Sequence, residues 1–111
     1  MDFLKDIEEY GEDVNDFEVS PFETIDMLHR RSRLNKEFSK MTLRERILLM
    51  RYDLRLLENV ERMVKHIEIV YDFSNSVEPL EEWWWHLDKV ATSELEIEIG
   101  LSPKDKVLKN N

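Results

Sequence analysis

Apolar side chains recur every three or four residues between Thr42 and Phe73, a stretch that contains no glycine or proline. The first apolar stripe consists of Leu43, Ile47, Met50, Leu54, Leu57, Val60, Val64, Ile67 and Tyr71, and the second of Leu49, Tyr52, Leu56, Val60, Met63, Ile67 and Val70. The two stripes predict one amphipathic helix over residues 43–73, with an apolar face wider than the seam of a two-stranded coiled coil. Thr42 and Glu45 have the spacing of a capping box at its start.

Such a helix would be too long for a compact domain. At ~1.5 Å per residue it would measure roughly 45 Å, whereas a compact chain of this size has a diameter of about 35 Å. The helix must therefore bend or break, or the molecule is elongated, or a second chain covers the excess. The first half of the stretch is basic and the second half acidic, so two antiparallel copies would pair opposite charges. We therefore expect a homodimer formed through Leu49, Leu56, Met63 and Val70.

The segments before this stretch also have helix signals. Ser20, Pro21 and Glu23 are typical of a helix start, and they predict a helix over residues 21–39. The short break that follows predicts an antiparallel hairpin with the long helix. Residues 1–19 are expected to form an acidic arm with a short helix over residues 2–10, which Gly11 ends. The arm would be solvated and mobile, or it would cover the basic segment, or it would mimic nucleic acid.

The C-terminal part contains three consecutive tryptophans, Trp83, Trp84 and Trp85, in a predicted helix over residues 79–92. Three residues in a row span about 200° of a helix, so at least one ring should face outward, where it would be part of an interface. In the alternative, two rings lie in the core and the third lies over a neighbouring loop. Residues 94–99 alternate between glutamate and an aliphatic side chain, which is typical of a half-buried strand. That strand would pair with Phe17–Val19, with a second copy or with a partner, unless the helix continues through it. Residues 101–111 are expected to be a flexible tail.

These elements predict an all-α protein. It would be a long antiparallel helical hairpin or small bundle, with a third, Trp-containing helix and room for one short C-terminal strand. The domain would cover residues 20–100. The chain has no cysteine and no apolar run of the ~20 residues that a membrane span requires, which favours a cytoplasmic protein without a membrane partner.

Charge is strongly segregated within a net charge of −9. Residues 1–19 contain eight acidic side chains and one lysine, whereas residues 29–55 contain nine basic and three acidic side chains. A basic patch is therefore expected at the end of the first long helix and the start of the next; its members are Arg30, Arg31, Arg33, Lys36, Lys40, Arg44 and Arg46. These basic side chains would be available to phosphate groups of nucleic acid, or they would pair with acidic side chains of the same chain.

Signals for catalysis are weak. The sequence has no glycine-rich phosphate loop, and no serine lies in a nucleophile-elbow context. Asp26 with His29, and Glu82 with His86, have helical spacing, but the paired Glu-x-x-His motif of a helical di-metal site is absent. We therefore expect neither an enzyme nor a cofactor or metal.

The preferred function is a protein–protein interaction module, such as an adaptor, an assembly factor or an inhibitor or antitoxin-like partner. It would bind a protein through Trp83, Trp84 and Trp85, because exposed aromatic side chains are enriched at interfaces, and it would dimerise through the long helix. The alternative is a regulator that contacts nucleic acid through the basic patch. The net negative charge disfavours that alternative.

Overall fold

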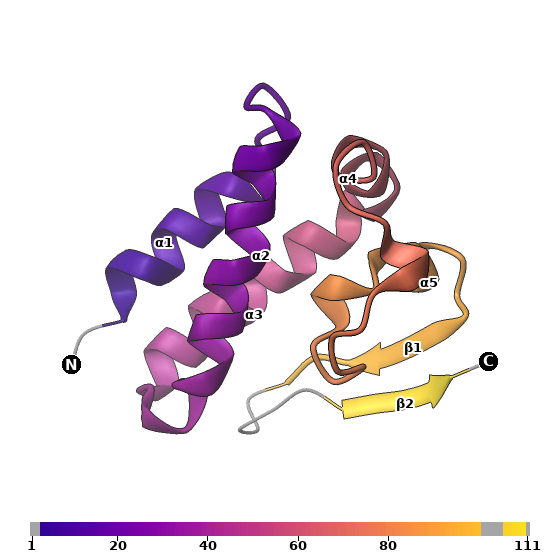
Figure 1. The fold of residues 1–111 in the computed structure, drawn as a ribbon. Coiled ribbons are helices and arrows are strands. Elements are labelled where there is room, and N and C mark those ends of the chain that lie inside the picture. Colours follow the sequence, from indigo (N-terminus) through magenta and orange to yellow (C-terminus); the bar gives the residue numbers. More distant parts are fainter. Residues whose placement is uncertain (1–2, 101–105, 111) are drawn as a thin grey trace.

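The structure, a computed structural model, describes residues 3–100 and 106–110 (Figure 1). Within them the chain forms a bundle of five α-helices and a two-stranded sheet, so the expected all-α class is confirmed. The helices are α1 (Leu4–Asp13), α2 (Pro21–Lys36), α3 (Leu43–Glu58), α4 (Val60–Ile67) and α5 (Leu87–Ala91). The strands are β1 (Leu95–Glu98) and β2 (Lys106–Asn110), and single 3-10 turns cover Phe38–Lys40, Phe73–Asn75 and Trp83–Trp85.

Helices α2 and α3 begin where their local signals predict. The Ser20 hydroxyl accepts a hydrogen bond from the Glu23 amide at 3.3 Å, and Pro21 occupies the first turn. Thr42 and Glu45 form the complete capping box, with bonds of 3.2 and 2.8 Å. These bonds satisfy amide groups that have no partner within a helix. The chain turns back between the two helices through the 3-10 turn Phe38–Lys40 (Figure 1).

The expected helix over residues 43–73 is wrong, because it breaks at Asn59 and its second part ends at Ile67. Asn59 has φ −103° and ψ 15°, and its amide bonds to the Leu56 carbonyl, which tightens the last turn of α3. Its side-chain amide donates to Asn15 in the α1–α2 loop. The chain then turns, and α4 packs on α2 and α5 (Figure 1). The break keeps the longest dimension of the molecule at 35 Å.

The N-terminal segment is part of the bundle and not a separate arm. Helix α1 buries Ile7 and Tyr10 in the core, and Val14, directly after the helix, is buried as well. The expectation that Gly11 ends the helix is wrong, since α1 continues to Asp13. A methyl group at Gly11 would overlap the ring of Tyr52, so the absence of a side chain at this position lets Tyr52 of α3 pack against α1.

The expected helix over residues 79–92 is also wrong. Trp83–Trp85 form a 3-10 turn, His86 is non-helical with φ −134°, and α5 covers only Leu87–Ala91. The tryptophan segment contacts α2 and α5, and its three side chains are buried. A regular helix on the surface could not bury all three.

The predicted strand is present as β1, and its partner is β2, antiparallel to it. None of the three expected partners was this segment, which was expected to be a flexible tail. The register places Glu96 opposite Lys109 and Glu98 opposite Lys106, with an irregularity between Glu96 and Ile97. Residues 101–105 and 111 of the expected tail lie outside the described residues. Among the described helices, none is both long and apolar enough to cross a lipid bilayer.

Candidate functional site

The three tryptophans expected to bind a partner lie in the core. Trp83 and Trp84 have no exposed surface, and Trp85 is 3% exposed. The expectation that one ring faces outward is therefore wrong. Packing explains the burial, because Trp83 and Trp84 meet edge to face at 5.4 Å and Trp85 contacts His29 in the same way at 4.9 Å.

Ser32 on α2 provides the polar partner that these indoles need. Its hydroxyl oxygen accepts the indole N–H of Trp84 at 2.9 Å and that of Trp85 at 2.8 Å. The same hydroxyl donates to Glu82 at 2.6 Å. A buried indole N–H without an acceptor would destabilise the fold. By accepting both N–H groups, Ser32 removes this cost for two adjacent tryptophans.

A second buried polar group lies beside it. Arg31 donates to Asp53 through Nε and Nη2, at 2.9 Å each, and Tyr10 donates to the same carboxylate at 2.6 Å. The Arg31 guanidinium also lies 4.3 Å from the centre of the Trp84 ring. These contacts join α1, α2, α3 and the tryptophan turn. They describe a structural network, since its side chains are closed to solvent.

The expected basic patch is divided among several roles. Arg31 is buried, Arg30 pairs with Glu9 at 3.0 Å and with Asp13 at 3.3 Å, and Lys40 pairs with Glu37 at 3.1 Å. Arg46 donates to the carbonyls of Phe38 and Ser39. Arg30, Arg31 and Arg46 therefore connect parts of the fold, whereas Lys40 is exposed and its ion pair lies on the surface. Arg33, Lys36 and Arg44 are exposed.

The residues expected to form a dimer face the interior of the chain. Leu49, Leu56 and Met63 have no exposed surface, and Val70 is partly buried after the end of α4. Three of the four therefore cannot reach a second chain while the fold is intact. The residues on which the homodimer was predicted are therefore not available as an interface.

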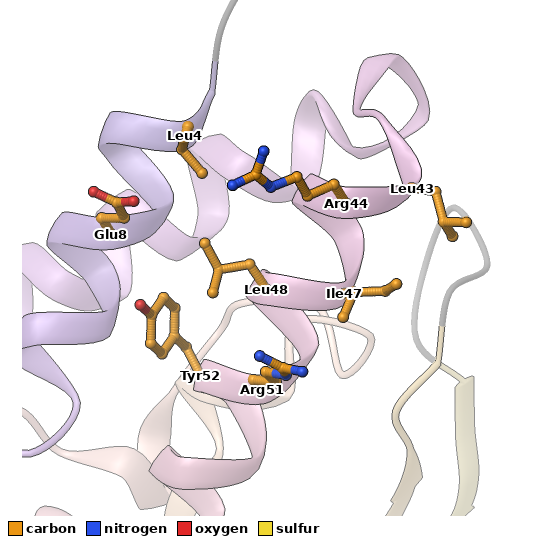
Figure 2. Close-up of a pocket in the computed structure, with 8 residues that line it drawn as sticks. All are labelled: Leu4, Glu8, Leu43, Arg44, Ile47, Leu48, Arg51 and Tyr52. Atoms are coloured by element: carbon orange, nitrogen blue, oxygen red, sulfur yellow. The ribbon is translucent and has the colours of Figure 1, made fainter.

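The surface is hollowed between α1 and α3. These helices run in the same direction, since the Phe3 amide donates to Glu45 at 3.0 Å near their starts and Gly11 meets Tyr52 further along. The groove between them has a volume of about 490 Å³. Figure 2 shows the eight residues that line it: Leu4, Glu8, Leu43, Arg44, Ile47, Leu48, Arg51 and Tyr52.

The groove combines an apolar floor with a charged rim. Leu4, Leu48 and Tyr52 are half-buried and form the floor, while Arg44 and Arg51 are exposed on the α3 side (Figure 2). Glu8 is the acidic residue of the lining and lies on α1. Ile47 and Leu43, which is 63% exposed, line the outer edge of the hollow and point away from α1 (Figure 2).

Sequence reasoning included four of these eight residues without recognising the site. Leu43, Ile47 and Tyr52 belong to the two apolar stripes, and Arg44 to the basic patch. Leu4, Glu8, Leu48 and Arg51 were not singled out as site residues. A signal was present, because arginines 44, 51 and 55 recur on the side of α3 opposite Leu49 and Leu56. Periodicity could not show which helix would lie next to this arginine-bearing side of α3.

The histidines have structural surroundings. His66 shares a hydrogen bond with Thr24 at 3.0 Å, and Phe17 packs edge-on against its ring. The His86 Nε2 lies 2.8 Å from the Glu78 carbonyl, which only accepts, so Nε2 carries the proton. In the part of the chain that the structure describes, no three His, Asp or Glu side chains are grouped so that they could hold a metal ion.

Two carboxyl groups titrate outside their ordinary range. Burial raises the pKa of Asp13, and the neighbouring Arg30 opposes that rise. Hydrogen bonds from the Ser74 and Asn75 side chains hold the pKa of Asp72 below its usual value of 3.8. Neither group lines the groove between α1 and α3. Both shifts therefore describe local structure and not a reactive site.

Comparison of the chain with protein-family models, with curated proteins and with solved structures finds no match.

Proposed function

We propose that this protein is a non-enzymatic protein-interaction module that binds its partner in the groove between α1 and α3. The groove is the observation that carries the proposal. It presents aliphatic side chains and one tyrosine to solvent, with two arginines at the rim. Contact surfaces of this kind gain binding energy from the apolar centre and selectivity from the charged edge.

The expected class of function, a protein-interaction module, is kept, but the binding surface is the groove and not the three tryptophans. An adaptor, an assembly factor or an inhibitor needs a stable scaffold and one accessible contact surface. The buried tryptophan turn and the Arg31–Asp53 pair fit the scaffold role. The nucleic-acid alternative has less support, because Arg30, Arg31, Lys40 and Arg46 are engaged within the chain.

Site-specific photo-crosslinking in the native host tests the proposal. A photoreactive phenylalanine analogue at Ile47, in the groove, should form an adduct with a specific protein. The matched control has the same analogue at Val77, which is 94% exposed and does not line the groove. The adduct should disappear when Leu48→Glu is added, with helical content unchanged by circular dichroism. Identical adducts from both positions, or none from Ile47, would contradict the proposal.

A further inference from the structure

The lining of the groove restricts what can occupy it. Arg44 and Arg51 are seven residues apart on α3, so they lie on the same side of the helix and about 10.5 Å apart along its axis. Leu48 lies between them in sequence, on the side nearer α1. The two cations therefore flank an apolar floor at an interval of two helical turns.

The floor has the spacing of a helix-binding surface. Leu4 and Glu8 are one turn apart on α1, and Leu48 and Tyr52 are one turn apart on α3. Parallel ridges one turn apart accept the side chains of a third helix, which repeat at the same interval. Between Leu43 and Tyr52 the groove is about 14 Å long, which corresponds to between two and three turns of the occupant.

Charge identifies the sign of the occupant. The exposed side of α3 carries Arg44, Arg51 and Arg55, with Glu58 as its exposed acidic residue at the end of the helix. Glu45 and Asp53 on the same helix are buried. A second copy that presented the same side of α3 would bring arginines against arginines, at a cost in free energy. An occupant with carboxylates would instead form ion pairs at the rim.

We propose that the groove binds an amphipathic α-helix of a partner protein that has two carboxylates seven residues apart. Its apolar stripe packs on Leu4, Leu48 and Tyr52, and its carboxylates pair with Arg44 and Arg51. This inference rests on the proposed function, for which it specifies the partner. The aliphatic floor favours a peptide over nucleic acid, since single strands are held by stacking on aromatic rings and Tyr52 is the one aromatic residue of the lining.

Peptide binding to the whole chain tests this directly. The probe is a labelled helical peptide with a leucine stripe and two glutamates seven residues apart, and the comparison peptide has lysines at those two positions. Fluorescence anisotropy should show about tenfold tighter binding of the glutamate peptide, because each rim ion pair contributes roughly 0.7 kcal/mol. The preference should weaken as salt is raised.

Charge reversal makes the test specific to the groove. In Arg44→Glu/Arg51→Glu the preference should reverse toward the lysine peptide. The control Arg33→Glu/Lys36→Glu changes charge equally at exposed positions of α2 that do not line this groove, and it should bind like the wild type. Both variants alter solvent-exposed side chains, so both should fold.

Other outcomes would overturn the inference. Equal binding of both peptides, or no binding of either, would exclude an acidic helix as the occupant. Tighter binding of a single-stranded oligonucleotide that depends on Arg44 and Arg51 would assign the groove to nucleic acid. A dimer in light scattering that Arg51→Glu dissociates would assign it to a second copy. If neither peptide is preferred or bound but Ile47 still crosslinks to another protein, the proposed function stands and only the acidic helical partner is wrong.

Discussion

Arg31 and Asp53 form a two-pronged ion pair in the centre of the molecule, with 1% and 2% of their side chains exposed. The pair joins α2 to α3, and Tyr10 adds α1 through its bond to the same carboxylate. Three helices that are consecutive in the chain thus contact one Asp side chain. The relative placement of α1 and α3, and hence the groove between them, depends on this contact.

Removing one member of the pair should be far more harmful than replacing both. Asp53→Ala leaves the Arg31 charge buried without its partner, and we expect a loss of about 3–5 kcal/mol in the free energy of unfolding. The double variant Arg31→Met/Asp53→Leu should lose much less than the sum of the two single changes. Urea denaturation measures both. A loss below about 1 kcal/mol for Asp53→Ala would show that the pair does not hold the core.

Ser32→Ala tests the partner of the indoles. It removes the acceptor of Trp84 and Trp85 together, and it should lower the free energy of unfolding by about 2–4 kcal/mol because two buried N–H groups lose their bonds. Tryptophan fluorescence can follow the unfolding. Ser39→Ala, at an exposed serine in the α2–α3 turn, is the matched control and should change stability by less than about 0.5 kcal/mol.

Gly11→Ala should destabilise the protein although alanine favours a helix. The methyl group would overlap the Tyr52 ring, which we expect to cost about 1–3 kcal/mol. In a Tyr52→Ala background the overlap disappears, and the same change should stabilise by about 0.5–1 kcal/mol through helix propensity alone. Thermal and urea unfolding of the four variants complete the cycle. The same sign in both backgrounds would be inconsistent with the close approach.

Asp72 should contribute to acid unfolding. Its carboxylate accepts bonds from the Ser74 amide at 3.1 Å and hydroxyl at 2.5 Å, so its pKa is lower in the folded chain than the usual 3.8. A carboxyl group with a lowered pKa stabilises the fold above pH 3.8, and that stabilisation is lost as the pH falls through the folded value. Asp72→Asn should therefore flatten the stability profile in this acid range. Asp26→Asn, at an exposed position on α2, is the comparison.

Much of the local structure followed from neighbouring residues. Ser20 and Thr42 cap the amides of residues three positions later in the chain. Four consecutive residues are therefore enough to indicate the start of α2 and of α3. The alternation around Ile97 predicted β1 in the same way. The helix caps are interactions between residues three apart, and the alternation is a local pattern, which is why a single sequence was enough to locate these elements. The pairing partner of β1 was not located in this way.

The sequence by itself determined the helical class, the two capped helix starts and the strand. The tertiary structure decided the rest: the break at Asn59, the burial of the tryptophans and the groove. Each depends on a partner far along the chain, such as Ser32 and Trp85, which are 53 residues apart. Periodicity shows which side of a helix is apolar, but it does not show which element will cover that side. The stretch after Thr42 was predicted correctly as helical over residues 43–58 and 60–67 but wrongly as one continuous helix to residue 73. Only packing decided that its first half would carry an open groove.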